Sequence, residues 1–110
     1  MKNILVTGNL GYIGSVLTEE LIFLGYNVIG YDIGYFKDCL VSEEKLPNKQ
    51  IIKDLRDIDK SDFDNVDGII HLAGLSNDPL GELQKNITNI VNFSATLKFA
   101  KLAKDLKIKR

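Results

Sequence analysis

Short runs of apolar residues recur along this chain and alternate with longer segments that have helical periodicity. Each run is rich in β-branched residues and is followed within two positions by glycine or aspartate; the runs lie at residues 4–6, 28–31, 51–53 and 68–72. Continuous apolar runs of this length, closed by a turn signal, are typical of buried strands in a parallel sheet. We therefore expect four parallel strands.

The segments between these runs have the spacing of helices that cover a sheet. Gly25 stands where a left-handed helix end belongs, after the evenly spaced residues Ile13, Val16, Leu17, Leu21 and Leu24. A second, long helix is expected over residues 82–107, with one face formed by Ile87, Ile90, Val91, Ser94 and Leu97. Residues 33–49 are expected to form a polar loop, and residues 56–66 a short helix or irregular crossover.

The alternation of strands and helices predicts an α/β fold with right-handed crossovers. We expect a partial, doubly wound Rossmann-type sheet in the strand order 3-2-1-4, with helices on both faces. A length of 110 residues is enough for one hydrophobic core, so residues 1–110 are expected to form a single domain.

Composition excludes several classes of protein. Apolar residues make up 45% of the chain and charged residues 26%, as in ordinary globular domains. The formal charge of −1 provides no basic field for nucleic acid or anionic lipid, and no apolar window approaches the roughly 20 residues of a membrane span. Cys39 is alone, and no Cys/His cluster indicates a metal site. We expect a soluble, cytoplasmic protein that binds no metal.

A glycine triplet lies between the first expected strand and the first expected helix. Gly8, Gly11 and Gly14 are three residues apart. In this context the first glycine permits a tight turn, the second lets a pyrophosphate approach the backbone, and the third lets the helix pack close to the strand. Phosphate groups then meet free amides at the helix N-terminus. The triplet predicts a dinucleotide-binding turn.

Asp32 ends the second expected strand, about twenty residues past the glycine turn. A carboxylate at this position accepts hydrogen bonds from the adenosine ribose hydroxyls and repels a 2′-phosphate. The next residue, Ile33, offers no positive charge to offset that repulsion. NAD is therefore the expected cofactor, rather than NADP.

Four motifs together resemble a known family. They are T-G-x-x-G-Y-I-G from Thr7 to Gly14, Asp32, D-L-R-D at 54–57 and H-L-A-G at 71–74. In this order and spacing the chain resembles, over nearly its whole length, the extended short-chain dehydrogenase/reductase family of NAD-dependent nucleotide-sugar epimerases and dehydratases. The resemblance implies that tightly held NAD accepts a hydride from the sugar ring and returns it after the keto intermediate has rearranged.

The resemblance also implies roles for single residues. Asp54 matches the carboxylate that binds the adenine amino group, with the Leu55 backbone beside the ring. Residues 72–74 match the segment along the cofactor's ribose and pyrophosphate, where the family more often has Ala-Ala than Ala-Gly, and Asn92 matches a helix asparagine near the active site. The complete predicted cofactor site comprises Gly8, Asn9, Leu10, Gly11, Tyr12, Ile13, Gly14, Asp32, Asp54, Leu55, Leu72, Ala73, Gly74 and Asn92.

Other residues with chemical potential are interpreted as structural. A lone histidine at a strand end, His71, is expected to be packed and hydrogen-bonded rather than catalytic. Tyr31, Tyr35 and Phe36 are expected to be packing or loop residues rather than a stacking platform for bases.

The family's proton-transfer residues have no counterpart in this sequence. The family uses a Ser or Thr after the next strand and a Tyr-x-x-x-Lys pair, whereas none of the four tyrosines here has a lysine four residues later. We expect no catalytic residue in this chain and no activity of the chain alone, with a nucleotide sugar bound only by the full-length parent. The strand at 68–72 is expected to lack the neighbour that would begin after Arg110, and self-association through this edge follows.

Two alternatives stay open at this point. One is a reductase of the same superfamily that acts on a non-sugar substrate. The other is a non-catalytic module that senses a dinucleotide or binds a partner. The glycine triplet and Asp32 fit all three functions.

Overall fold

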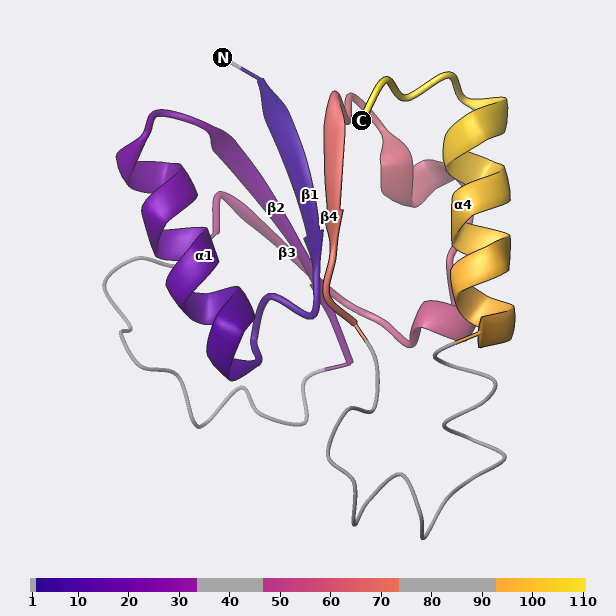
Figure 1. The fold of residues 1–110 in the computed structure, drawn as a ribbon, viewed down its shortest axis with the longest axis horizontal. Coiled ribbons are helices and arrows are strands. Elements are labelled where there is room, and N and C mark those ends of the chain that lie inside the picture. The colour runs from indigo at the N-terminus through magenta and orange to yellow at the C-terminus, as the bar shows by residue number, and fades with distance from the viewer. Residues whose placement is uncertain (1, 34–46, 74–92) are drawn as a thin grey trace, which may run out of the picture.

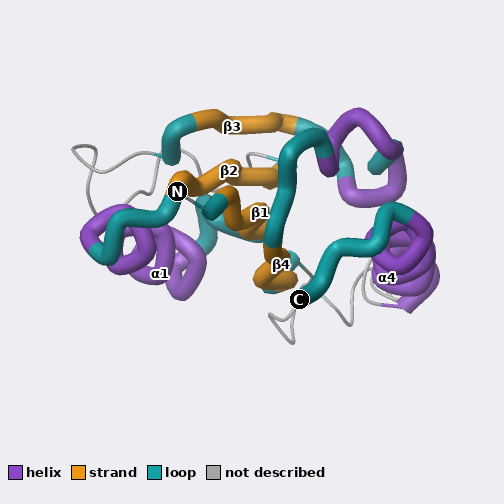
Figure 2. Tube along the Cα trace, turned by 90° about the horizontal axis from the view of Figure 1, so that it is seen from above, coloured by secondary structure: helices purple, strands orange, loops and turns teal. Residues whose placement is uncertain are grey.

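A computed structural model of the chain describes residues 2–33, 47–73 and 93–110. Four parallel strands form one sheet in the order β3-β2-β1-β4. The strands are β1 (Asn3–Thr7), β2 (Asn27–Asp32), β3 (Lys49–Ile52) and β4 (Gly68–His71). Helix α1 (Tyr12–Phe23) lies on one face and helix α4 (Ala95–Asp105) on the other, as Figures 1 and 2 show. The expected strand order and two-sided arrangement are confirmed.

The register of the sheet brings three strand ends to the same level. Thr7 at the end of β1 pairs with Tyr31 of β2 on one side and with His71 of β4 on the other. These ends lie at the bottom of Figure 1, where α1 begins, and both chain termini lie at the opposite end of the sheet. Residues that follow β1, β2 and β4 are therefore gathered at one edge.

Element boundaries differ from the expected ones in detail. β3 begins at Lys49, two residues earlier than expected. The expected crossover at 56–66 contains two short 3-10 helices, η2 (Leu55–Asp57) and η3 (Lys60–Phe63), the second closed by a capping box between Asp59 and Asp62. Of the long helix expected over 82–107, α4 ends at Asp105, and residues 82–92 lie outside the described residues.

The main core lies between the sheet and the α4 side. Its buried members are Leu5, Ile29, Tyr31, Leu55, Ile58, Phe63, Val66, Ala95 and Phe99. The rings of Phe63 and Phe99 are 5.1 Å apart, so η3 packs against α4. The helix face proposed from the sequence is wrong here: Ser94 and Leu97 are exposed, and the sheet is covered by Ala95 and Phe99 instead. The large aromatic ring buries more apolar surface than the leucine.

Helix α1 corrects a second expectation about helix faces. Of the five residues expected on the packed face, Leu17 and Leu21 are half-buried, whereas Ile13, Val16 and Leu24 are exposed, and the buried positions are Gly14 and Thr18. The Thr18 hydroxyl donates to the Gly14 carbonyl at 2.7 Å. Small residues form this face because the start of α1 lies against the turn after β1, where larger side chains have no room.

The expected end of α1 is confirmed. Gly25 has a φ of +91°, and the amide of Tyr26 donates to the Leu21 carbonyl at 3.0 Å. This is the hydrogen-bonding pattern of a Schellman cap, which satisfies carbonyls that the helix leaves free.

Gly14→Ala tests the close contact at the start of α1. A Cβ atom at Gly14 would overlap the backbone carbonyl oxygen of Gly8, so we expect the free energy of unfolding to fall by about 1 to 3 kcal/mol or more. Gly11→Ala is the matched control, because its Cβ would lie 3.4 Å from the same oxygen, and its effect should stay within about 0.5 kcal/mol. Urea denaturation measures both; equal losses would contradict the assignment.

Candidate functional site

The turn after β1 is held between β2 and the segment that follows β4. Gly8 has a φ of +75°, and its amide donates to the Tyr31 carbonyl at 2.8 Å. A Cβ atom at Gly8 would lie 2.8 Å from the amide nitrogen of Ala73. Glycine is thus required at this position by both backbone angle and space. The contact fixes residues 72–73 beside the glycine turn.

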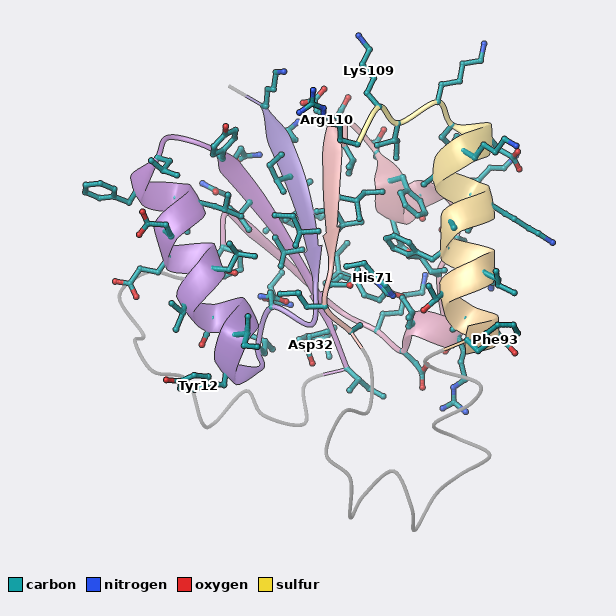
Figure 3. All side chains as sticks on the ribbon, viewed as in Figure 1. Tyr12, Asp32, His71, Phe93, Lys109 and Arg110 are labelled. Atoms are coloured by element: carbon teal, nitrogen blue, oxygen red, sulfur yellow. The ribbon has the colours of Figure 1, made fainter. Side chains whose placement is uncertain are left out.

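The N-terminus of α1 opens onto this turn without a side-chain cap. Gly11 is the N-cap residue, and the first turn carries no acidic residue. The first amides of a helix lack intrahelical partners and carry partial positive charge, so they attract anions. The fold itself does not require glycine at position 11, since a Cβ there would make only an ordinary contact. The side chains of Tyr12 and Ile13 are exposed, and Figure 3 shows Tyr12 at the start of α1.

Asp32 is anchored to the glycine-rich turn. Its Oδ2 atom accepts a hydrogen bond from the Leu10 amide at 3.1 Å, and Figure 3 shows the residue at the sheet edge where the strands end. A negative charge therefore stands at the end of β2, beside the backbone that leads into α1.

Two residues of the turn direct their side chains into the protein. Leu10 is buried, and Asn9 is 1% exposed. The Asn9 amide exchanges two hydrogen bonds with Gln50 of β3, Nδ2 to Oε1 at 2.6 Å and Gln50 Nε2 to Oδ1 at 3.1 Å. Gly30 of β2 leaves the space that this amide pair fills. The side chains of Asn9 and Leu10 are thus directed away from a ligand at the turn.

Asp54 follows β3 and is held by its neighbour Arg56. The Oδ1 atom accepts from the Arg56 amide at 2.9 Å and from Nε at 3.0 Å, and Oδ2 accepts from Nη2. These hydrogen bonds from Arg56 keep the pKa of the Asp54 carboxyl below its usual value. The carboxylate is therefore an ionised acceptor in a fixed position, while the side chain of Leu55 is buried in the core.

The side chain of Tyr31 is hydrogen-bonded to the backbone of Asp54. Its hydroxyl donates to the Asp54 backbone carbonyl at 2.9 Å, and the side chain is 1% exposed. Burial, together with the carboxylates of the 54–62 segment, raises the pKa of Tyr31 above its ordinary value. The expectation that Tyr31 is a packing residue is confirmed.

A threonine and a histidine connect the ends of β1 and β4. The Thr7 hydroxyl oxygen accepts from the amides of Leu72 at 3.1 Å and Ala73 at 3.2 Å. It also lies 2.7 Å from Nδ1 of His71, whose Nε2 lies 3.0 Å from the hydroxyl oxygen of Thr96 on α4. Figure 3 shows His71 between β4 and α4. The expectation of a packed, hydrogen-bonded histidine is confirmed.

The predicted site residues within the described ranges gather at one edge of the sheet. Gly74 and Asn92 lie outside the described residues, as do Tyr35 and Phe36. The sequence reasoning did not single out Thr7, Gln50 or Arg56 as functional. Thr7 and Arg56 stand inside the quoted motifs, whereas nothing local to Gln50 indicates its partner, which lies 41 positions away.

No group of three or more His, Cys, Asp or Glu side chains within residues 2–33, 47–73 and 93–110 is arranged to hold a metal ion. Among the helices of the same ranges, none has the length and apolar character needed to cross a membrane.

Comparison with protein families decides the assignment. The model of the NAD dependent epimerase/dehydratase family matches residues 4–110. The chain belongs to this family. NAD is the cofactor that goes with the family, which confirms the cofactor expected from Asp32 and the glycine turn, and the family's general function is epimerisation or dehydration.

Individual relatives agree with this membership. The chain is 42% identical over 74 residues to the bifunctional protein GAL10 of Pachysolen tannophilus, a match that covers 66% of this chain and 10% of that protein. Its fold is similar to that of a UDP-N-acetylglucosamine 4-epimerase from Methanobrevibacter ruminantium M1, with 31% identity and a TM-score of 0.85 over 98% of this chain and 36% of the other.

A further solved structure shares the fold. A UDP-glucose 4-epimerase from Thermotoga maritima is 24% identical, with a TM-score of 0.84 over 97% of this chain and 35% of the epimerase. This chain spans about a third of the length of these solved structures and a tenth of GAL10.

Proposed function

We propose that this chain forms the NAD-holding part of a nucleotide-sugar epimerase or dehydratase. The observation that carries the proposal is the uncapped N-terminus of α1 beside Gly11, a glycine that the fold does not itself require. The name of one relative, a UDP-N-acetylglucosamine 4-epimerase, supports a nucleotide sugar as the substrate class.

The residues present fit NAD in charge and shape. The amides at the start of α1 suit the pyrophosphate, and the missing side chain at Gly11 leaves room for it. The carboxylate of Asp32 suits ribose hydroxyls, and the carboxylate of Asp54 suits the adenine amino group. The backbone of Leu72 and Ala73 forms a wall beside the glycine turn.

The role of this chain in the reaction is to hold and orient the cofactor. Bound NAD supplies an acceptor for a hydride from the sugar ring. The side chains of Asp32 and Asp54 supply two fixed negative charges, and the main chain supplies a set of amides. No tyrosine of the sequence has the lysine partner needed for proton transfer. Binding, rather than proton transfer, is therefore the property to measure on this chain.

Gly11→Val tests the proposed pyrophosphate site. The branched side chain would occupy the space of the phosphates, and the loss of two charge-assisted hydrogen bonds predicts an affinity for NAD lower by about a hundredfold or more. Calorimetry measures the affinity, and far-UV circular dichroism should remain near native because the position is open. Gly11→Ala is the graded control, with a smaller loss. Unchanged affinity in Gly11→Val would reduce Gly11 to a turn residue.

Asp32 predicts a preference for NAD over NADP. Two charges a few ångströms apart repel each other by about 1 to 4 kcal/mol near a protein surface, so NADP should bind at least about tenfold more weakly. Asp32→Asn keeps an acceptor for the Leu10 amide and removes the charge, so the ratio of the two dissociation constants should approach one. Tighter binding of NADP by the unaltered chain would contradict the assignment.

We also infer that the 110-residue chain self-associates through the edge formed by β4. This strand is the last in the sheet order of the described residues, and its beginning is covered where the Ile69 amide donates to the Arg110 carbonyl at 2.8 Å. A strand edge that is covered only in part is a template for a second strand. Light scattering over a range of concentrations should show a mass that rises with concentration. A constant monomer mass would mean that Arg110 is sufficient to protect the edge.

A further inference from the structure

The hydroxyl of Thr7 is surrounded by three nitrogen atoms at the end of β1. Two are backbone amides that can only donate, from Leu72 at 3.1 Å and Ala73 at 3.2 Å. The third is Nδ1 of His71 at 2.7 Å. A hydroxyl group has one proton and two lone pairs. The Leu72 amide also donates to the Thr7 backbone carbonyl at 3.0 Å, so it is shared between two acceptors. Of the three nitrogen atoms, Nδ1 alone can accept a hydrogen bond, and it is therefore the available acceptor for the Thr7 proton.

This arrangement favours one tautomer of His71. Nδ1 accepts from Thr7, so the proton of the neutral ring resides on Nε2. Nε2 then donates to the Thr96 hydroxyl oxygen at 3.0 Å, which ties the ring to α4. A chain of hydrogen bonds thus runs from α4 through His71 and Thr7 to the backbone after β4.

The surroundings of the ring favour the neutral form. His71 stacks on Phe99 of α4 with ring centroids 4.9 Å apart and an interplanar angle of 22°. Its contacts from β1 and α4 are Thr7, Thr96 and Phe99, and burial alone lowers the pKa of His71 from its ordinary value. Within the described part of the chain, no charged side chain contributes to that shift.

We propose that neutral His71 is a positioning residue for the cofactor wall: it orients the Thr7 hydroxyl so that its oxygen holds the amides of Leu72 and Ala73. These residues lie against Gly8, where a Cβ atom would come within 2.8 Å of the Ala73 nitrogen. A small movement of the Leu72–Ala73 backbone therefore changes the space beside Gly8. The effect on NAD rests on the proposed function, whereas the tautomer and the amide contacts do not.

Protonation of His71 breaks this chain of hydrogen bonds at Thr7. An imidazolium ring donates from both nitrogens, so Nδ1 no longer accepts from Thr7, and the hydroxyl must reorient to accept from Nδ1 as well. The unfolded chain binds this proton at about pH 6.5, and the folded chain only at a lower pH. The stability of the fold and the order of the Leu72–Ala73 backbone are therefore retained above about pH 6.5, the pKa in the unfolded chain. Both fall as the pH is lowered through the pKa of folded His71.

The chain's single histidine makes the tautomer directly measurable. Long-range ¹H–¹⁵N spectra of the 110-residue chain near neutral pH should show the proton on Nε2, and the amide signals of Leu72 and Ala73 should shift with the titration of His71. A proton on Nδ1 would overturn the proposal, and so would amide signals of Leu72 and Ala73 that do not change as His71 titrates. Both measurements are independent of NAD, so they test the hydrogen bonds from His71 through Thr7 to the two amides even if the chain binds no dinucleotide.

Two variants of His71 test whether these hydrogen bonds affect the affinity for NAD. His71→Asn retains an acceptor for the Thr7 proton, and His71→Leu removes it. We expect the affinity for NAD to fall about three- to tenfold in His71→Leu, the effect of losing one hydrogen bond, and to be largely restored in His71→Asn. The unaltered chain should bind NAD more weakly below the pH at which His71 titrates in these spectra than at neutral pH, and His71→Asn should lose this dependence. Equal affinities in both variants, or a pH dependence that persists in His71→Asn, would contradict the positioning role.

Discussion

The structure depends on a close approach of backbone segments in the turn after β1. Gly8 lies against the amide of Ala73, and Gly14 lies against the carbonyl of Gly8, with no room for a side chain at either position. This contact places the first turn of α1, the end of β1 and the segment after β4 within reach of one another. Backbone amides at the start of α1 can then serve as ligand donors.

Around this contact, the charged groups of the site are fixed by hydrogen bonds that the fold supplies. The Leu10 amide holds Asp32, and Arg56 holds Asp54. Asp32 is the last residue of β2 and Asp54 follows β3, and the parallel register brings these strand ends to one edge. The site therefore combines the positive end of a helix with two negative side chains, as a dinucleotide with anionic phosphates and donor hydroxyl and amino groups requires.

Much of the fold could be predicted from the local pattern of residues. The four strands, their order and the end of α1 at Gly25 were predictable because apolar runs and glycines act within a few positions. The packed faces of the helices were predictable only in part: in α1, Leu17 and Leu21 are half-buried as expected, but Gly14 and Thr18 are buried where Ile13 and Val16 were expected. Spacing identifies an apolar stripe, but the separation between helix and sheet selects which residues fit beneath it.

By itself, the sequence determined the chemistry offered at the site: three glycines at a helix start, Asp32 and Asp54 after strands, and a threonine before the turn. Only the tertiary structure decided which of these groups touch. It turned the Asn9 side chain inward to Gln50, and it placed Thr7, His71 and Thr96 in one line of hydrogen bonds across two strands and a helix. Such pairings join residues between 25 and 64 positions apart, and no local spacing encodes them. They form because a buried polar group must find a partner among the groups that the packed elements bring near it.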